Sequence, residues 1–539
     1  MAKDLHTNKD KDKIFYWSST KQVALTKNKL NRYKTLGWRY SRPFEPVGLQ
    51  PMNTLKNPLA SLAQPQLLQA ASLSQPSTGA HFAVANPATQ QPIAWVAEMG
   101  AADTDAAIAA AHTALPAWRS RTAYERSRIL RKWFDLLQAH KEDLARIMTA
   151  ENGKPTVEAL GEVQYAASFV EWYAEEAKRA YGEVLTPNVA GQRSVVIKQA
   201  IGVCAAITPW NFPLAMITRK VAPALAAGCT VVLKPADLTP LSALAAAELA
   251  YQAGIPQDAL HIVTGSNAKA IGDAMCASDT VRHLSFTGST GVGRLLMQQC
   301  AHTVKKLALE LGGNAPVLVF DDADLDAVVA GLMAQKFRNT GQACVSPNRV
   351  LVQAGIYEEL LRRITAAVAA LKTGDGFTEG VQIGPLINTK AIEKVEAHVN
   401  NALAMGARAL TGGKALSDIG AQFFAPTVLA DCQPDMRLSC EETFGPILSV
   451  FPFETEAEAI VRGNDTEYGL AAYLYTRDNA RAWRVAEALE AGMVSINAGL
   501  LSADQSPFGG VKQSGLGREG GRQGMHEYQE EKTIAFGNI

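Results

Sequence analysis

Residues 281–300 read VRHLSFTGSTGVGRLLMQQC and show the unit from which the chain is built. A short apolar strand, His283–Phe286, leads through a glycine-rich turn into a helix that begins after Thr290. The same order recurs at two other apolar strands, Thr230–Lys234 and His261–Thr264, each followed by a helix. Strands that alternate with helices predict a parallel, doubly wound sheet.

A second block of the same kind follows Gly313, and a helical region precedes the first block. The second block predicts a strand at Ala315–Phe320, a helix at Asp324–Asn339 and a strand at Arg349–Gln353. The preceding region predicts helices at Ala102–Trp118, Ala123–Asn152 and Thr156–Tyr181, and an extended stretch at Ser194–Ala206. We therefore expect two α/β domains with a cleft between them.

Composition restricts the class of protein. The 539 residues exceed the size at which one hydrophobic core stops growing, and 47% are hydrophobic and 19% charged, which is an ordinary globular composition. Equal numbers of basic and acidic side chains, 52 each, argue against a nucleic-acid partner, and no apolar run is long enough to cross a membrane. The seven cysteines include no C-x-x-C pair, so we expect reduced thiols, no metal site and a cytoplasmic protein.

The first residues differ from the rest. Residues 1–51 carry eleven Lys and Arg against four Asp and Glu, and they lack the apolar periodicity of a packed element. We expect residues 1–60 to be a disordered basic extension, and Met52 is an alternative start of the chain.

Four motifs carry residues suited to catalysis. Cys344 follows a helix and a Gly-containing turn, where a thiol can face a cleft, although a single cysteine is more often a small buried apolar residue. Glu310 stands before two glycines, and Asn211 lies in the stretch Thr208–Pro213. The fourth motif is the glycine-rich turn at Phe286–Gly293.

Together these motifs resemble the aldehyde dehydrogenase superfamily, from about residue 82 to the C-terminus. Residues 216–220, 336–339 and 507–515 resemble the succinate-semialdehyde dehydrogenases within it. The resemblance implies an α/β fold of two doubly wound parallel-sheet domains plus a β oligomerisation arm. It implies a cofactor-binding domain at 61–185 and 205–312, a catalytic domain at 313–505, and an arm at 186–204 and 506–539.

The resemblance also implies a mechanism. Cys344 would attack the aldehyde as a thiolate and form a thioester. The side-chain amide of Asn211 and the backbone N–H of Cys344 would hold the negative oxygen, and Glu310 would activate the water that hydrolyses the thioester. Without the motifs, Asn211 would be an ordinary turn residue and Glu310 a solvated carboxylate.

The implied cofactor is NAD or NADP. The spacing of Gly288, Gly291 and Gly293 departs from the common dinucleotide fingerprint, yet it places N–H groups and the Ser289 hydroxyl at a helix N-terminus, which favours a pyrophosphate. An acidic Asp237 near the adenosine ribose favours NAD over NADP. The residues implied for cofactor binding are Thr208, Trp210, Lys234, Asp237, Gly288, Ser289, Gly293, Glu442 and Phe444.

Substrate and assembly follow from the same resemblance. Arg219, Arg338 and Ser502 would bind the distal carboxylate of succinate semialdehyde, with glutarate semialdehyde and 2-oxoglutarate semialdehyde as alternatives. A catalytically idle scaffold that keeps the fold is another alternative. Residues 192–206 and 529–536 resemble an intersubunit arm with exposed strand edges, so we expect a homo-oligomer, either a dimer or a tetramer.

Overall fold

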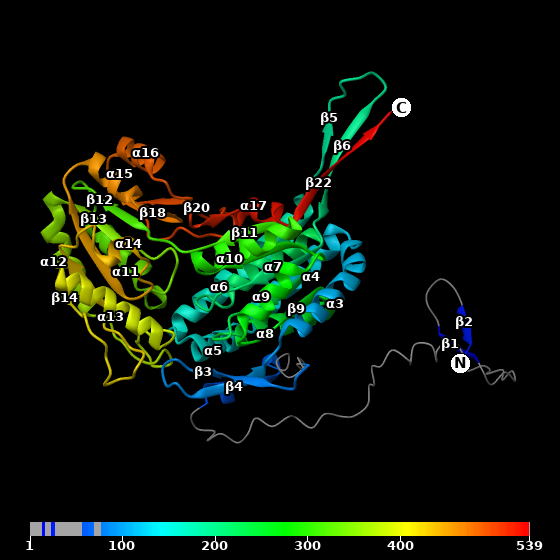
Figure 1. Cartoon of the computed structure of the whole chain (residues 1–539), viewed down its shortest axis with the longest axis horizontal. Coiled ribbons are helices and arrows are strands. Elements are labelled where there is room, and N and C mark those ends of the chain that lie inside the picture. Colours follow the sequence, from blue (N-terminus) through cyan, green and yellow to red (C-terminus); the bar gives the residue numbers. More distant parts are fainter. Residues whose placement is uncertain (1–12, 17–22, 27–56, 69–76, 538–539) are drawn as a thin grey trace, which may run out of the picture. The chain divides into compact units, whose positions relative to one another are not determined.

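The computed structural model describes residues 13–16, 23–26, 57–68 and 77–537 (Figure 1). The chain divides into two compact units, Met1–Met52 and Asn53–Ile539. In the first unit, β1 (Lys13–Tyr16) pairs antiparallel with β2 (Val23–Thr26). Most of the predicted extension 1–60 lies outside the described residues, so its disorder stays a prediction.

A six-stranded sheet forms one half of the unit Asn53–Ile539, in the order β21-β11-β10-β7-β8-β9. All its strands are parallel except the short β21, which pairs antiparallel with β11. The strands are β7 (Val203–Ile207), β8 (Thr230–Lys234), β9 (Leu260–Ile262), β10 (Val281–Thr287), β11 (Lys306–Glu310) and β21 (Gly515–Leu516). The three strands predicted in this region are β8, β9 and β10.

Helices cover both faces of this sheet, because successive strand residues point to opposite sides. Cys204 and Ala206 of β7 pack in one apolar cluster with α4 to α8, whereas Val203 and Ala205 pack with α3, α9 and α10. The helices are α3 (Ala101–Arg119), α4 (Ala123–Ala139), α5 (Lys141–Asn152), α6 (Thr156–Glu176), α7 (Ala215–Ala227), α8 (Leu241–Ala253), α9 (Ala268–Ala277) and α10 (Thr290–Cys300).

A seven-stranded sheet forms the second half, in the order β14-β15-β16-β13-β12-β18-β19, with β14 alone antiparallel. Val317 and Val319 pack on α11 and α12, and Leu318 packs on α13, α15 and α16. The strands are β12 (Pro316–Val319), β13 (Arg349–Gln353), β14 (Arg408–Thr411), β15 (Thr427–Ala430), β16 (Ile447–Phe453), β18 (Ala471–Tyr475) and β19 (Met493–Ile496). The helices are α11 (Leu325–Lys336), α12 (Tyr357–Ala369), α13 (Thr389–Ala404), α14 (Arg437–Cys440), α15 (Glu456–Asn464) and α16 (Asn479–Ala488).

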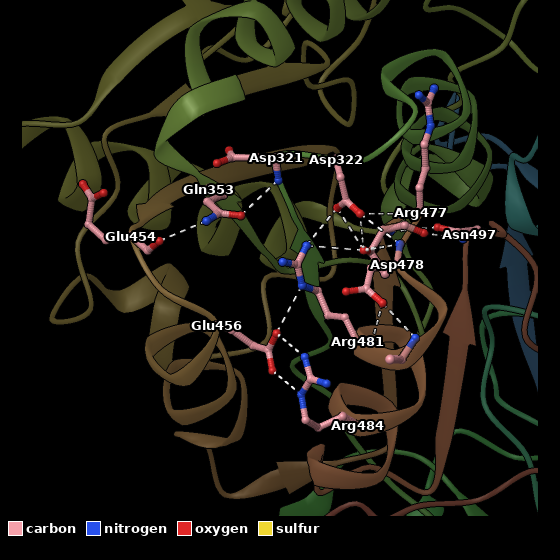
Figure 2. Close-up of polar contacts among 12 residues, drawn as sticks. Asp321, Asp322, Gln353, Glu454, Glu456, Arg477, Asp478, Arg481, Arg484 and Asn497 are labelled. Carbon is pink, nitrogen blue, oxygen red and sulfur yellow. Dashed lines mark hydrogen bonds and ion pairs between the residues drawn. The ribbon is translucent and has the colours of Figure 1, made fainter.

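Each sheet reverses its strand order at one strand. β7 lies between β8 and β10, and β12 lies between β13 and β18. Ligands of doubly wound sheets bind beyond the carboxyl ends of the strands at such points. Beyond β12 this edge holds polar contacts around Asp322, whose carboxylate accepts the Thr476 hydroxyl at 2.8 Å and Nη1 of Arg481 at 3.0 Å (Figure 2). The corresponding edge beyond β7 carries the candidate cofactor residues.

A separate three-stranded sheet consists of β5 (Glu183–Leu185), β6 (Arg193–Ala200) and β22 (Gln529–Phe536). It extends away from the helices (Figure 1), and most residues of β5 and β22 are exposed. The strands of this sheet overlap the arm predicted at 186–204 and 506–539, whose bounds and role in oligomerisation stay predictions. Gly202, with φ of 139°, lies between β6 and β7. The stretch Ser194–Ala206, predicted as extended, therefore contributes one strand to each of two sheets.

The remaining elements connect these parts. The hairpin of β3 (His81–Ala85) and β4 (Pro92–Ala97) opens the region described from residue 77. The others are β17 (Tyr468–Gly469), β20 (Val511–Lys512) and α17 (Gly521–His526). No helix in the described part of the chain is long and apolar enough to cross a bilayer. The division into a cofactor-binding and a catalytic domain at 312–313 stays a prediction, although each sheet has its own apolar clusters.

Candidate active site

Cys344 follows a strained turn at the end of α11. Asn339 and Thr340 have φ values of 49° and 58°, and Gly341 follows with 75°. Residues other than glycine rarely adopt this left-handed backbone, and such strain persists only where the surroundings enforce it. The carboxylate of Glu158 accepts the backbone N–H of Asn339 at 2.7 Å and helps to enforce the turn. Cys344 itself stays partly exposed, unlike most of the other cysteines.

Several charged groups act on the Cys344 thiol. Burial raises its pKa to about 12. Arg219 and Arg338 oppose this rise, whereas Glu442 and Glu310 add to it. All four are sequence-predicted site residues, so the fold brings them together around the thiol. At neutral pH the free protein therefore holds a thiol, and reaction needs a group that removes its proton.

Glu310 ends β11 and is 3% exposed. Its Oε2 is buried and has no hydrogen-bond partner among the described residues. Burial raises its pKa well above the ordinary value, Glu519 adds to the rise, and Arg219 and Lys220 oppose it. A carboxylate with a raised pKa is a stronger base, which suits proton transfer near neutral pH.

Asn211 lies between the turn after α11 and the start of α7. Its side-chain Nδ2 donates to the backbone carbonyl of Gln342 at 3.0 Å. The backbone carbonyl of Asn211 accepts a hydrogen bond from Nδ2 of Asn339 at 2.8 Å. An amide nitrogen carries two hydrogens, so one remains for a ligand. The backbone N–H of Cys344 has no acceptor in the described part of the chain. Both predicted oxyanion donors therefore have a hydrogen without a partner among the described residues, and their role stays a prediction.

A buried charge cluster lies beside these residues and was not predicted. Glu519, 4% exposed, binds Nε of Arg219 at 2.6 Å and also Nζ of Lys220. Burial opposes ionisation of Glu519, but Lys220 and Arg219 outweigh burial, and its pKa is lowered. Glu519 is far from Arg219 in sequence, and carboxylates are usually exposed. No local sequence pattern therefore predicts this buried ion pair.

The predicted substrate residues are not equivalent. Arg219 is 1% exposed and stacks on Phe508 at 4.1 Å, with Nε committed to Glu519. Arg338 is half-buried over the Phe212 ring at 4.8 Å, and its Nε has no partner among the described residues. Ser502 is hydrogen-bonded to the Tyr165 hydroxyl. Arg338 is therefore the freer of the two guanidinium groups, and only part of Arg219 remains for a ligand.

The candidate residues for the adenosine side lie at the carboxyl ends of β7 and β8. Thr208 follows β7, and its buried hydroxyl has no partner in the described structure. Lys234 ends β8, is 3% exposed, and donates only to the neighbouring Pro235 carbonyl at 3.0 Å. Asp237 is half-buried and acts electrostatically on Lys234. At the ends of two adjacent strands there are thus a hydroxyl without an internal partner and an ammonium group with a single one.

The glycine-rich turn precedes α10. Ser289 is the N-cap of this helix, but its side chain makes no capping hydrogen bond. A Cβ at Gly288 would meet the Phe286 ring at 2.4 Å, and one at Gly293 would meet Leu311 at 2.4 Å. The N–H groups at the start of α10 are therefore free to bind an anion. The two glycines pack closely against Phe286 and Leu311.

Glu442 and Phe444 lie in the segment between α14 and β16. Oε1 of Glu442 accepts the Gly313 N–H at 3.0 Å, and burial raises the pKa of Glu442 to about 7. Phe444 has φ of 57° and packs edge-on against Trp210, with ring centroids 5.6 Å apart. Lys336, also missed in the sequence, is 1% exposed, and burial lowers its pKa to about 7, against the opposing effect of Glu442.

The described residues contain no group of three or more His, Cys, Asp or Glu side chains that could hold a metal ion. The site is therefore built from one thiol, carboxylates, guanidinium groups and amide donors.

The chain is similar to known proteins over most of its length. The model of the aldehyde dehydrogenase family matches residues 74–534. A succinate-semialdehyde dehydrogenase of Escherichia coli, named for NADP(+), is 56% identical over 461 residues, 86% of this chain and 95% of that protein. A glutarate-semialdehyde dehydrogenase of Pseudomonas putida is 56% identical over 458 residues, 85% of this chain and 95% of that protein. The crystal structure of succinate-semialdehyde dehydrogenase from Burkholderia pseudomallei, 56% identical, has a TM-score of 0.85 and covers 86% of this chain and 96% of that one.

Proposed function

This chain belongs to the aldehyde dehydrogenase family, and from that premise we propose that it oxidises succinate semialdehyde to succinate. Relatives named for succinate semialdehyde and for glutarate semialdehyde are equally similar to it, at 56% identity. Both aldehydes carry a distal carboxylate, and Arg338 presents a guanidinium beside the thiol. The proposed class of substrate is therefore an aldehyde with a carboxylate at its far end.

One observation carries this proposal. The thiol of Cys344 lies within electrostatic reach of a high-pKa carboxyl, Glu310, and of two arginines. The thiol supplies the nucleophile, the carboxylate supplies the base, and the arginines supply charge for an acidic substrate. An idle scaffold has no need of a buried, unpartnered carboxyl oxygen at this place.

The chain's own residues account for the covalent steps. The carboxylate of Glu310 takes the proton of the Cys344 thiol and then releases it to solvent. The sulfur bonds to the aldehyde carbon, while Nδ2 of Asn211 and the backbone N–H of Cys344 hold the developing negative oxygen. After oxidation the acyl group stays on sulfur as a thioester. Glu310 takes a proton from water, the resulting hydroxide attacks the thioester, and the acid leaves as the thiolate is restored.

A nicotinamide dinucleotide fits a set of polar groups that have few or no internal partners. Lys234 and Thr208 would hold the adenosine side, Ser289 and the N-terminus of α10 the pyrophosphate, and Glu442 the nicotinamide ribose. Phe444 and Trp210 would pack beside the ring. When bound, this group supplies the acceptor for the hydride that the aldehyde carbon loses.

The choice between NAD and NADP rests on Asp237. Its carboxylate favours a free 2′-hydroxyl and repels a 2′-phosphate, so NAD is the expected preference. The Escherichia coli relative, whose name specifies NADP(+), gives this preference no support. The ratio of kcat/KM for the two cofactors decides it, and Asp237→Ser should move the ratio toward NADP.

The experiment that tests the function follows absorbance of the reduced nicotinamide with four aldehydes. Succinate semialdehyde should be the best substrate, ahead of glutarate semialdehyde, 2-oxoglutarate semialdehyde and hexanal. Cys344→Ala should lose all turnover while its calorimetric affinity for the cofactor stays within about 2-fold of wild type. Turnover that survives in this variant would refute the thioester mechanism, and hexanal as the best substrate would refute the acidic-substrate assignment.

We also infer a homo-oligomer. β5 and β22 expose both faces of a three-stranded sheet, and Val184 and Phe536 are 78% and 48% exposed. A small sheet of this kind has marginal stability by itself. Its exposed apolar side chains would be buried if the sheet packed against a second copy of the chain.

A further inference from the structure

His398 is a polar residue on an apolar helix face. The buried face of α13 also carries Val395, Val399 and Ala402, and His398 is fully buried among them. A polar ring in such a row is unfavourable unless its nitrogens are hydrogen-bonded. Burial lowers the pKa of His398, so the ring is neutral near pH 7.

Both ring nitrogens bond to the segment that carries Glu442. Nε2 of His398 lies 3.1 Å from Oε2 of Glu441, and Nδ1 lies 3.2 Å from Oγ1 of Thr443. Glu441 is held ionised by its pair with Arg437, which lowers its pKa. Nε2 therefore carries the hydrogen and donates to Glu441, and Nδ1 accepts the hydroxyl hydrogen of Thr443.

These two partners flank Glu442. Glu442 lies between them in the chain and bonds a different partner, because its Oε1 accepts the Gly313 N–H at 3.0 Å.

Asn348 holds the backbone of the same residues. Its Oδ1 accepts the Thr443 N–H at 3.2 Å, and its Nδ2 donates to the Glu441 carbonyl at 3.0 Å. Asn348 is 3% exposed and also bonds Asn314. The backbone around Glu442 is thus fixed by Asn348, and the two flanking side chains are fixed by His398.

We propose that His398 is a positioning residue for cofactor binding, which orients Glu442 toward the nicotinamide ribose by holding Glu441 and Thr443. The inference rests on the proposed role of Glu442 and extends it to a residue on α13, an element remote in sequence from the segment that carries Glu442. His398 contributes no proton to the reaction. Its effect is on the affinity for the cofactor.

The test compares His398→Phe, which keeps a ring of similar size and removes both bonds, with Val399→Ala, a neighbouring buried residue on α13. His398→Phe should raise the Kd for the oxidised cofactor, measured by calorimetry without aldehyde, by about 3- to 10-fold, the loss of one to two hydrogen bonds. The KM for cofactor should rise by the same factor while kcat changes by less than about 2-fold. Val399→Ala should change neither.

Two milder variants guard against a folding defect. Thr443→Val removes one bond and keeps the side-chain shape, and His398→Gln keeps the donor to Glu441. Each should give a Kd between those of wild type and His398→Phe. The proposal would be overturned if His398→Phe, His398→Gln and Thr443→Val all bound the cofactor with the Kd of the wild type.

A double-mutant cycle with Glu442→Ala shows whether His398 acts through Glu442. If it does, His398→Phe should add less than about 2-fold to the Kd of Glu442→Ala. Fully multiplicative effects would overturn the positioning role alone. If Glu442→Ala leaves the Kd unchanged, the assignment of Glu442 in the proposed function fails, and the inference falls with it.

Discussion

From the proposed role of Glu442 at the nicotinamide ribose and its raised pKa, we predict that cofactor affinity depends on pH. Burial places this pKa near 7, and only the carboxylate accepts hydrogen bonds from both ribose hydroxyls. Raising the pH through 7 ionises the group, so the KM for cofactor should fall, by about 5-fold between pH 6 and pH 7. KM measured at saturating aldehyde from pH 5.5 to 8.5 checks this expectation.

Lys336 provides the control for this pH dependence, because its pKa also lies near 7. Removing its charge in Lys336→Met should shift the midpoint upward, since the lysine stabilises the carboxylate of Glu442. Glu442→Gln should flatten the profile. A profile that keeps its slope in Glu442→Gln would assign the titration to another group.

The two substrate arginines should behave differently when replaced. Arg338→Ala removes a guanidinium with a free Nε and should lower kcat/KM for succinate semialdehyde by about 10- to 150-fold, the value of a charge-assisted hydrogen bond, with little change for hexanal. Arg219→Ala leaves Glu519 with Lys220 as its remaining ion-pair partner, so both aldehydes should suffer and stability should fall. Kinetics with both aldehydes and melting temperatures separate these outcomes. An equal loss on both aldehydes in Arg338→Ala would show that this arginine is structural.

The residues near the nucleophile could be predicted from the sequence because each of them lies in a recognisable motif. Glu310, Arg219 and Arg338 act electrostatically on the Cys344 thiol, while the roles that the motifs imply for them stay predictions. The partner of Arg219 could not be predicted, because Glu519 reaches it only through the folding of the C-terminal region onto α7. His398 was missed for a related reason, since on α13 it occupies a position that periodicity assigns to an apolar side chain.

Among elements, the carboxyl edge of β12 depends on Asp322 (Figure 2). Burial opposes ionisation of Asp322, but the Thr476 hydroxyl and the N–H groups of Arg477 and Asp478 outweigh burial and lower its pKa. Its contribution to stability is therefore present above its unfolded pKa and is lost as pH falls through the lowered folded value.

Asp322→Ala should lower the free energy of unfolding by about 1–2 kcal/mol at pH 7, because several donors lose a partly exposed acceptor. Asp321→Ala is the matched control, since the side chain of Asp321 lies outside this network while its backbone N–H bonds Gln353. Urea unfolding at pH 7 measures both variants. If Asp322→Ala and Asp321→Ala had the same free energy of unfolding, water would be replacing the Asp322 carboxylate as hydrogen-bond acceptor.

Element boundaries show where sequence patterns are sufficient. β8 and β13 coincide with the predicted strands Thr230–Lys234 and Arg349–Gln353, because each is a short apolar run with clear ends. The predicted helix Ala123–Asn152 breaks at His140, where neither Gly nor Pro marks the break. Local preference does not encode this bend, so packing of α4 and α5 against α6 must determine it.

For the whole molecule, the exposed sheet predicts assembly. The double variant Val184→Lys with Phe536→Glu places charges on apolar positions that are exposed in the single chain. It should fold, yet sediment closer to a single chain than wild type does, because charge opposes burial at an interface. Val157→Lys, at an equally exposed valine on α6, should keep the wild-type mass. A wild type that sediments as a single chain would contradict the expected oligomer.

The pairing of Arg219 and Lys220 with Glu519 also has a consequence for biosynthesis. A ribosome makes Asn211, Glu310 and Cys344 before it makes Glu519. Until then the two buried cations lack their counter-ion, and a buried unpaired charge is strongly unfavourable. A nascent chain stalled before Glu519 should therefore hold an incompletely packed α7, so that completion of the site waits for a carboxylate that is translated late.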